Sequence, residues 1–128
     1  MLGRHKLVTM KKQIKSKNNK NCDAPYYCAV GATLSVIGGK WKPIIIFKLI
    51  QNDILRFGEL KKEINGVTQR MLTQQLRELE SDKVVTRKVY AQVPPRVEYS
   101  LTPYGKTLEP IMIAMCNWGT EHITIQDK

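Results

Sequence analysis

Two short amphipathic segments, residues 57–64 and 69–80, are separated only by a break around Asn65-Gly66. The second segment follows Thr68, whose hydroxyl can accept a hydrogen bond from an amide of the first helical turn. Its leucines recur at i, i+4 and i+7 and therefore line one face of a helix: Leu72, Leu76 and Leu79. The sequence predicts two helices joined by a tight turn, an arrangement that restricts the chain to few folds.

A β-hairpin is predicted directly after this pair of helices. Residues 84–90 and 96–102 have strand-like composition, and in the second strand apolar side chains alternate with polar ones, so one face is buried. Pro94-Pro95 cannot continue the hydrogen-bonded ladder and stiffens the loop between the strands.

Three further helices complete the prediction. Residues 29–37 form one that ends at Gly38-Gly39, and residues 41–50 are apolar nearly all round. A buried strand is an alternative for 41–50, but the length of this segment and an early proline favour a helix. A closing helix begins at Thr102-Pro103, with a kink at Pro110. These elements predict a mostly helical α+β fold.

The net charge of +10 is concentrated at the N-terminus. Seven of the 21 Lys and Arg residues, and no Asp or Glu, lie in residues 1–22. We expect residues 1–23 to be a disordered basic tail, although Met10 is an alternative start that would make residues 1–9 a cloning addition. Because most of the net charge lies in this tail, charge alone is only weak support for a polyanionic partner.

Residues 24–128 are expected to form one domain.

Several classes of protein are disfavoured by what the sequence lacks. The cysteines Cys22, Cys28 and Cys116 have neither disulfide-framework nor metal-site spacing, which fits a reducing compartment. No apolar run approaches the roughly 18 residues of a membrane span, and there is no secretory h-region. No catalytic grouping is recognisable. We therefore expect a cytoplasmic protein that is not an enzyme, uses no cofactor or metal and has no membrane partner.

With the elements in this order, residues 28–122 resemble the HxlR-type family of winged helix-turn-helix regulators, relatives of the MarR group. The resemblance implies that the hairpin is a wing, that the terminal helices form a homodimer, and that the protein controls transcription, as a repressor or an activator. Many members have Cys-Pro where this chain has Cys28-Ala29. The matching strings are IGGKWKP at 37–43, RFGEL at 56–60, QRMLTQQLRELE at 69–80, VPPRVEYSLTPYGKTL at 93–108 and WG at 118–119.

Double-stranded DNA is the partner that the second helix and the hairpin predict. Opposite its leucines, the helix carries Gln69, Arg70, Thr73, Gln74 and Arg77. Gln and Arg side chains can form paired hydrogen bonds with adenine and guanine in the major groove. We predict base contacts for Arg70 and Gln74, and phosphate contacts for Thr68, Thr73 and Arg77. Phosphate or minor-groove contacts are predicted for the basic residues of the wing, Arg87, Lys88 and Arg96. An ordinary solvated surface is the alternative for both groups.

Regulation and assembly are predicted from two other features. Cys28 lies near a helix start, with Lys40 and Lys42 close in sequence, so a thiol sensor is the hypothesis and simple packing the alternative. The closing helix has an apolar stripe that predicts a dimer interface: Leu108, Ile111, Met112, Met115 and Trp118. Two alternative functions are a winged-helix protein-interaction module without specific DNA binding and a thiol oxidoreductase built on Cys28.

Overall fold

The computed structural model describes residues 28–126 and divides into two compact units, 1–38 and 39–128. Of the described elements, only helix α3 (Ala29–Ile37) belongs to the first unit. It has the predicted bounds and ends at Gly38. The predicted basic tail and Cys22 lie outside the described residues.

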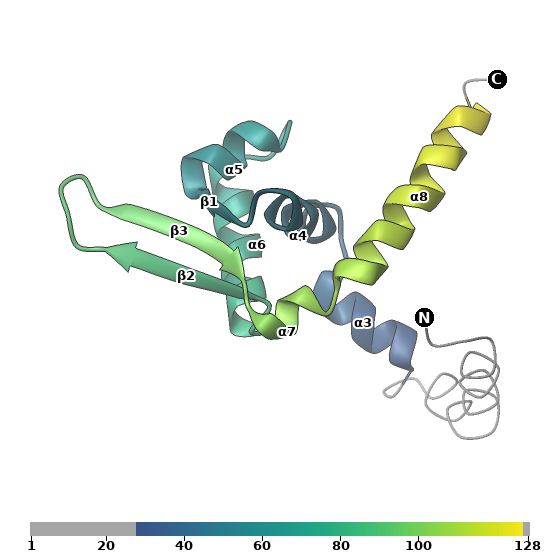
Figure 1. Ribbon diagram of the computed structural model, residues 1–128, viewed down its shortest axis with the longest axis horizontal. Coiled ribbons are helices and arrows are strands. Elements are labelled where there is room, and N and C mark those ends of the chain that lie inside the picture. Colours follow the sequence, from purple (N-terminus) through teal and green to yellow (C-terminus); the bar gives the residue numbers. More distant parts are fainter. Residues whose placement is uncertain (1–27, 127–128) are drawn as a thin grey trace. The chain divides into compact units, whose positions relative to one another are not determined.

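The second unit contains the helix pair and the hairpin that the sequence predicted (Figure 1). The segment after Gly39 is helical, so the strand alternative for it is wrong. Aliphatic side chains from successive elements meet in one core that includes Ile45, Leu60, Leu76 and Val84. The elements are α4 (Trp41–Asn52), β1 (Ile54–Arg56), α5 (Phe57–Glu63), α6 (Gln69–Ser81), β2 (Val85–Tyr90), β3 (Arg96–Leu101), α7 (Pro103–Lys106) and α8 (Glu109–Gln126).

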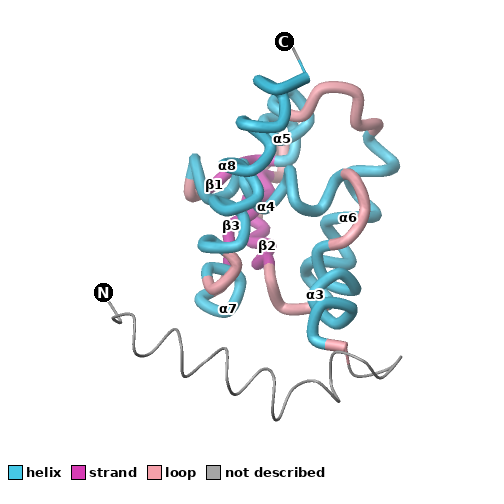
Figure 2. Tube along the Cα trace, turned by 90° about the vertical axis from the view of Figure 1, so that its right-hand side faces the viewer, coloured by secondary structure: helices cyan, strands magenta, loops and turns pink. Residues whose placement is uncertain are grey.

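The strands form one antiparallel sheet in the order β1-β3-β2. They are magenta in Figure 2. Strand β1 was not predicted, because three residues are too few to display an alternating pattern. Its Leu55 is opposite Tyr99 of β3, and both side chains are buried. The hairpin of β2 and β3 extends beyond the helices and has the form of a wing (Figure 1).

The turn between α5 and α6 has the predicted local chemistry. Gly66 adopts φ +89°, a left-handed conformation that costs little without a Cβ atom. The Thr68 hydroxyl accepts a hydrogen bond from the Met71 amide over 3.1 Å, so the predicted N-cap is confirmed. The leucines at 72, 76 and 79 are all buried. This capped helix therefore presents its other face to solvent.

The closing segment is not one helix with a kink, as predicted, but two helices. Pro110 is the second residue of α8, where its missing N–H breaks no intrahelical bond. The break comes earlier, at Thr107 and Leu108, whose amides donate to the carbonyls three residues back, those of Tyr104 and Gly105. At the start of α7, the Thr102 hydroxyl accepts from the Gly105 amide and donates to the Lys83 carbonyl. Gly105 approaches the Val84 carbonyl so closely that a Cβ atom there would collide with it. These contacts attach α7 to the base of the wing.

Helix α8 leaves α4 and projects away from the rest of the second unit (Figure 1). Met112 is its one buried residue. Among the described residues, no single helix is long and apolar enough to cross a membrane, and α3 and α4 reach that threshold only when they are counted together.

Candidate nucleic-acid interface

The exposed face of α6 brings the predicted DNA contacts together. One shallow groove of about 460 Å³ is lined by Gln69, Arg70, Thr73, Gln74 and Arg77. Its side chains offer hydrogen-bond donors and acceptors and two positive charges, without a carboxylate. The Thr73 hydroxyl donates its hydrogen to the Gln69 carbonyl within the helix. The hydroxyl oxygen of Thr73 can therefore still accept a hydrogen bond. Thr68 is exposed immediately before this groove. The leucine pattern alone was sufficient to predict this face.

A buried lysine lies behind this face. Lys42, in the first turn of α4, has a side chain that is only 10% exposed, and its Nζ donates to Glu78 Oε1 over 2.7 Å. The other carboxylate oxygen of Glu78 accepts from Gln74 Nε2 over 2.6 Å. These two hydrogen bonds, together with the positive charge of Lys42, lower the pKa of the Glu78 carboxyl below its ordinary 4.5. Sequence reasoning missed this link because it joins helices that are distant in the chain.

The strand register divides the predicted wing contacts between two faces. Lys88 is opposite Glu98, and Tyr90 is opposite Arg96, so these four side chains share one face of the sheet. Arg87 is opposite Tyr99 and lies on the other face, with its Nε 3.7 Å from Glu80 Oε1 of α6. The structure therefore places Arg87 beside α6 and places Lys88 and Arg96 on the outward face of the wing.

On that outward face, two cations flank one aromatic ring. Lys88 Nζ lies 5.0 Å from the centre of the Tyr90 ring, and the Arg96 guanidinium carbon lies 4.3 Å from it. The Tyr90 hydroxyl donates to Glu98 Oε1 over 3.0 Å. Arg96 Nε is 3.3 Å from Glu98 Oε2, but the pair lacks the alignment of a hydrogen bond. Glu98 thus offsets part of the charge of Arg96.

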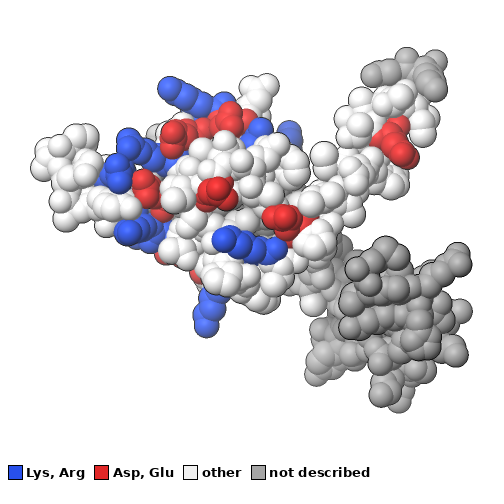
Figure 3. Space-filling model, in the orientation of Figure 1, with Lys and Arg blue, Asp and Glu red and all other residues white. Residues whose placement is uncertain are grey.

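Arg56 is a basic residue that sequence reasoning did not assign to this face. In the strand register Arg56 is opposite Glu98, which is itself opposite Lys88, so these three residues lie in one row across the sheet. The string RFGEL contained it, but its position depends on β1, which is too short to predict. In Figure 3, Lys and Arg side chains lie near the base of the wing and at other places on the body, with Asp and Glu among them, whereas α8 has no Lys or Arg.

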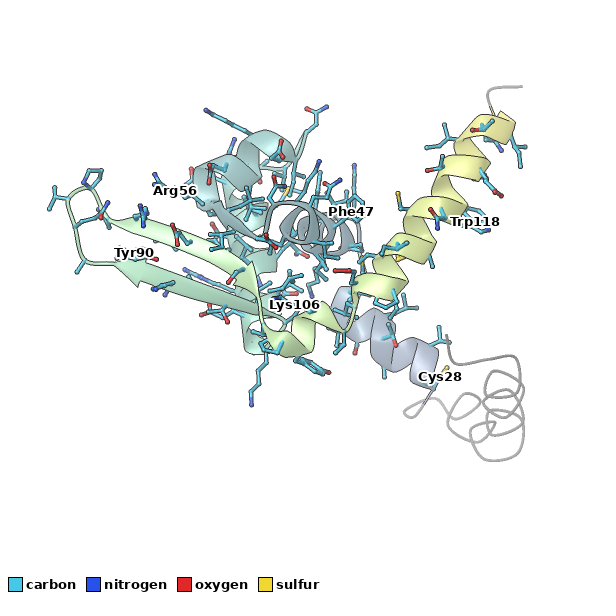
Figure 4. All side chains as sticks on the ribbon, viewed as in Figure 1. Cys28, Phe47, Arg56, Tyr90, Lys106 and Trp118 are labelled. Carbon is cyan, nitrogen blue, oxygen red and sulfur yellow. The ribbon has the colours of Figure 1, made fainter. Side chains whose placement is uncertain are left out.

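The residues of the predicted dimer stripe lie in two environments. Met112 is buried and Leu108 is half-buried, whereas Ile111, Met115 and Trp118 are exposed. The exposed three are spaced along α8 at i, i+4 and i+7, and Trp118 is labelled in Figure 4. The line then extends through His122, whose ring stacks on that of Trp118 with the ring centres 4.9 Å apart. Ile125 follows at the next helical step and is 66% exposed. The exposed line is therefore longer than predicted but excludes Met112.

Cys28 occupies the N-cap position of α3 and is half-buried. Its carbonyl accepts from the Ala32 amide, which places the thiol at the positive end of the helix. The two lysines considered with it have partners of their own, because Lys42 binds Glu78 and the Lys40 ammonium lies 4.8 Å from the centre of the Trp41 ring.

Between residues 28 and 126, no three His, Cys, Asp or Glu side chains are grouped so that they could hold a metal ion.

Comparison with known proteins gives consistent matches. A family model described as HxlR-like helix-turn-helix matches residues 36–127. The HTH-type transcriptional regulator YdeP of Bacillus subtilis is 54% identical over 101 residues, which cover 79% of this chain and 78% of YdeP. Among solved structures, the redox regulator HypR in its oxidised form has 55% identity and a TM-score of 0.70, over 73% of this chain and 96% of HypR. Its reduced form has 52% identity and a TM-score of 0.72, over 77% and 96%.

Proposed function

Because the chain belongs to the HxlR-like helix-turn-helix family, we propose that it is a transcriptional regulator that binds operator DNA as a homodimer. The observation that carries the proposal is the groove on α6, where two arginines and two glutamines are exposed on one face of a capped helix. A helix of this size fits the major groove of B-DNA, and these are the side chains that pair with guanine and adenine edges.

The wing supplies the second part of the interface. Lys88 and Arg96 on its outward face, and Arg87 beside α6, contact the phosphates that flank the major groove or enter the minor groove. Thr68, Thr73 and Arg77 contact the phosphates next to α6. Arg70 and Gln74 contact bases.

Two copies of the chain associate through the exposed apolar line of α8, which leaves two α6 helices related by a twofold axis. The symmetry predicts operator half-sites about 34–36 Å apart, which is one turn of DNA. A solvent-exposed tryptophan followed by isoleucine on one line is typical of a protein interface.

Thiol chemistry at Cys28 regulates binding. HypR is described as a redox regulator and has been solved in oxidised and reduced forms, and its similarity to this chain supports the hypothesis. Cys28 is the N-cap residue of α3, and its half-buried thiol is a group that oxidants and electrophiles can modify. Modification of Cys28 changes the spacing of the two α6 helices and so releases the operator.

Selection of bound duplexes from fragmented genomic DNA tests the proposal. We expect a recurrent, twofold-symmetric sequence, bound with an affinity that falls steeply as salt rises. If no duplex is enriched over a scrambled pool and salt has no effect, the proposal is wrong, and a winged-helix module that binds another protein takes its place.

A further inference from the structure

Gln74 is the residue of the α6 groove whose side chain is hydrogen-bonded to another side chain, that of Glu78. Its amide nitrogen donates to Glu78, and Glu78 is in turn bound by the buried Lys42. Burying an ammonium group is costly unless it is paired, so Lys42 and Glu78 hold each other in place. The two hydrogen bonds therefore connect the inside of the unit to its proposed DNA-contacting surface.

The ionised carboxylate determines which end of the Gln74 amide faces it. A glutamine amide has two orientations of nearly equal shape, with the oxygen and nitrogen exchanged. A carboxylate only accepts hydrogen bonds, so the NH₂ group must face Glu78 and the carbonyl oxygen must point to the other side. Glu78 is ionised at neutral pH, as an ordinary glutamate is, and its contacts with Lys42 and Gln74 lower its pKa further. Without Glu78, either end of the amide could face a base.

We propose that Glu78, held by Lys42, is a positioning residue that makes Gln74 present its carbonyl oxygen to DNA. On the strand that Gln74 contacts, the preferred bases are then adenine and cytosine, whose exocyclic amino groups donate a hydrogen bond in the major groove. Guanine and thymine present acceptors at the equivalent positions, which would face the carbonyl oxygen unfavourably. The inference depends on the proposed binding of DNA by α6.

Lys42 has a second consequence for binding. An unpaired glutamate on the DNA-facing helix would repel nearby phosphates, but the ammonium group 2.7 Å away offsets its charge. The arrangement thus places a carboxylate beside the groove without a net negative charge. Glu80 is the matched control, since it is on the same helix and its side chain is 42% exposed, compared with 41% for Glu78. Its ion-pair partner is Arg87 instead of a buried lysine.

The experiment determines base preferences by selecting bound sequences from randomised duplexes at fixed salt. The profile of Gln74→Ala, compared with that of the unmodified protein, identifies the position that Gln74 contacts. We expect Glu78→Gln to lose about tenfold of the discrimination against guanine and thymine at that position only. Glu80→Gln makes the same change of charge and should leave the profile unchanged. The double variant Lys42→Met, Glu78→Gln removes the ammonium group that would itself orient the introduced amide, and it should also lose the discrimination.

Stability is measured on the same proteins, because Glu78→Gln leaves Lys42 buried without its counter-charge. If that single variant unfolds, the double variant replaces it, since it removes the buried charge as well. A profile that the double variant leaves unchanged at the Gln74 position overturns the inference, as does a Gln74→Ala profile identical to that of the unmodified protein. In both cases DNA binding itself persists, whereas failure of the unmodified protein to bind any duplex would contradict the proposed function instead.

Discussion

Arg70 is the residue whose loss best separates base recognition from general attraction to phosphates. It lies in the α6 groove, and a guanidinium group can donate two parallel hydrogen bonds to guanine. We expect Arg70→Ala to cost about 1–3 kcal/mol on the selected operator and much less on a scrambled duplex. Titration of both duplexes at one salt concentration measures the difference. Equal weakening on both would make Arg70 a phosphate contact.

Cys28 provides a second test at this scale. We expect DNA bound by the unmodified protein to be released after mild treatment with peroxide, quinone or aldehyde, and dithiothreitol to restore binding where the adduct is reversible. Cys28→Ser should remain bound under the same treatment. Cys116→Ser is the control, because Cys116 is exposed on α8 and removal of its thiol should not protect the complex. Equal release from all three proteins would make Cys28 a packing residue.

At the scale of elements, predictions succeeded where a pattern was local. The leucine repeat, the Thr68 cap and the Asn65-Gly66 break were sufficient for α6 and the turn before it, because each depends on residues within one or two helical turns. The placement of α7 depends instead on contacts of Thr102 and Gly105 with the segment before β2, about twenty residues away in sequence. The kink predicted at Pro110 considered only the closing helix, so it placed the break at the wrong residue.

The candidate site shows the same division between local and distant information. Helical periodicity alone predicts the groove residues of α6. The Lys42 partner of Glu78 is instead on α4, and the register of β2 with β3 decides which wing residues share a face. The sequence analysis assigned Arg87 and Lys88 to one group because both are basic wing residues. The side chains of adjacent residues in a strand point to opposite faces, so the two lie on different faces of the wing. The interface therefore required tertiary contacts that no single segment contains.

The wing yields a graded prediction. Neutralising a phosphate contact weakens binding on all sequences and reduces the salt slope by about 1. We expect that full reduction for Lys88→Ala, and a smaller one for Arg96→Ala because Glu98 already offsets part of its charge. Lys106→Ala removes the same charge from α7 and should leave the slope unchanged. The slopes come from binding curves at several salt concentrations, and identical slopes for Lys88→Ala and the unmodified protein would remove the wing from the interface.

For the whole molecule, the central expectation is that two copies associate through α8. Ile111, Met115, Trp118 and Ile125 lie on one line of a helix that projects from the second unit, and water is a poor environment for so continuous an apolar surface. Met112 is unsuitable for testing this interface, because it is buried within the chain and a charge there would disturb the fold. Trp118 is 69% exposed, so its substitution leaves the core intact.

We therefore expect Trp118→Glu to convert a dimer into a monomer, because it places a charge in an apolar contact on both copies at once. Thr120→Glu is the matched control, since Thr120 is exposed about 200° around the same helix from Trp118. Sedimentation at micromolar concentration distinguishes the 14.7 kDa chain from a species of twice that mass. The Trp118→Glu monomer should remain folded, although its unfolding temperature falls because dimerisation no longer stabilises the native state. It should bind the two-half-site operator far more weakly, because it loses the second α6 helix. An unmodified protein that sediments as a monomer under these conditions would contradict the proposed dimer directly.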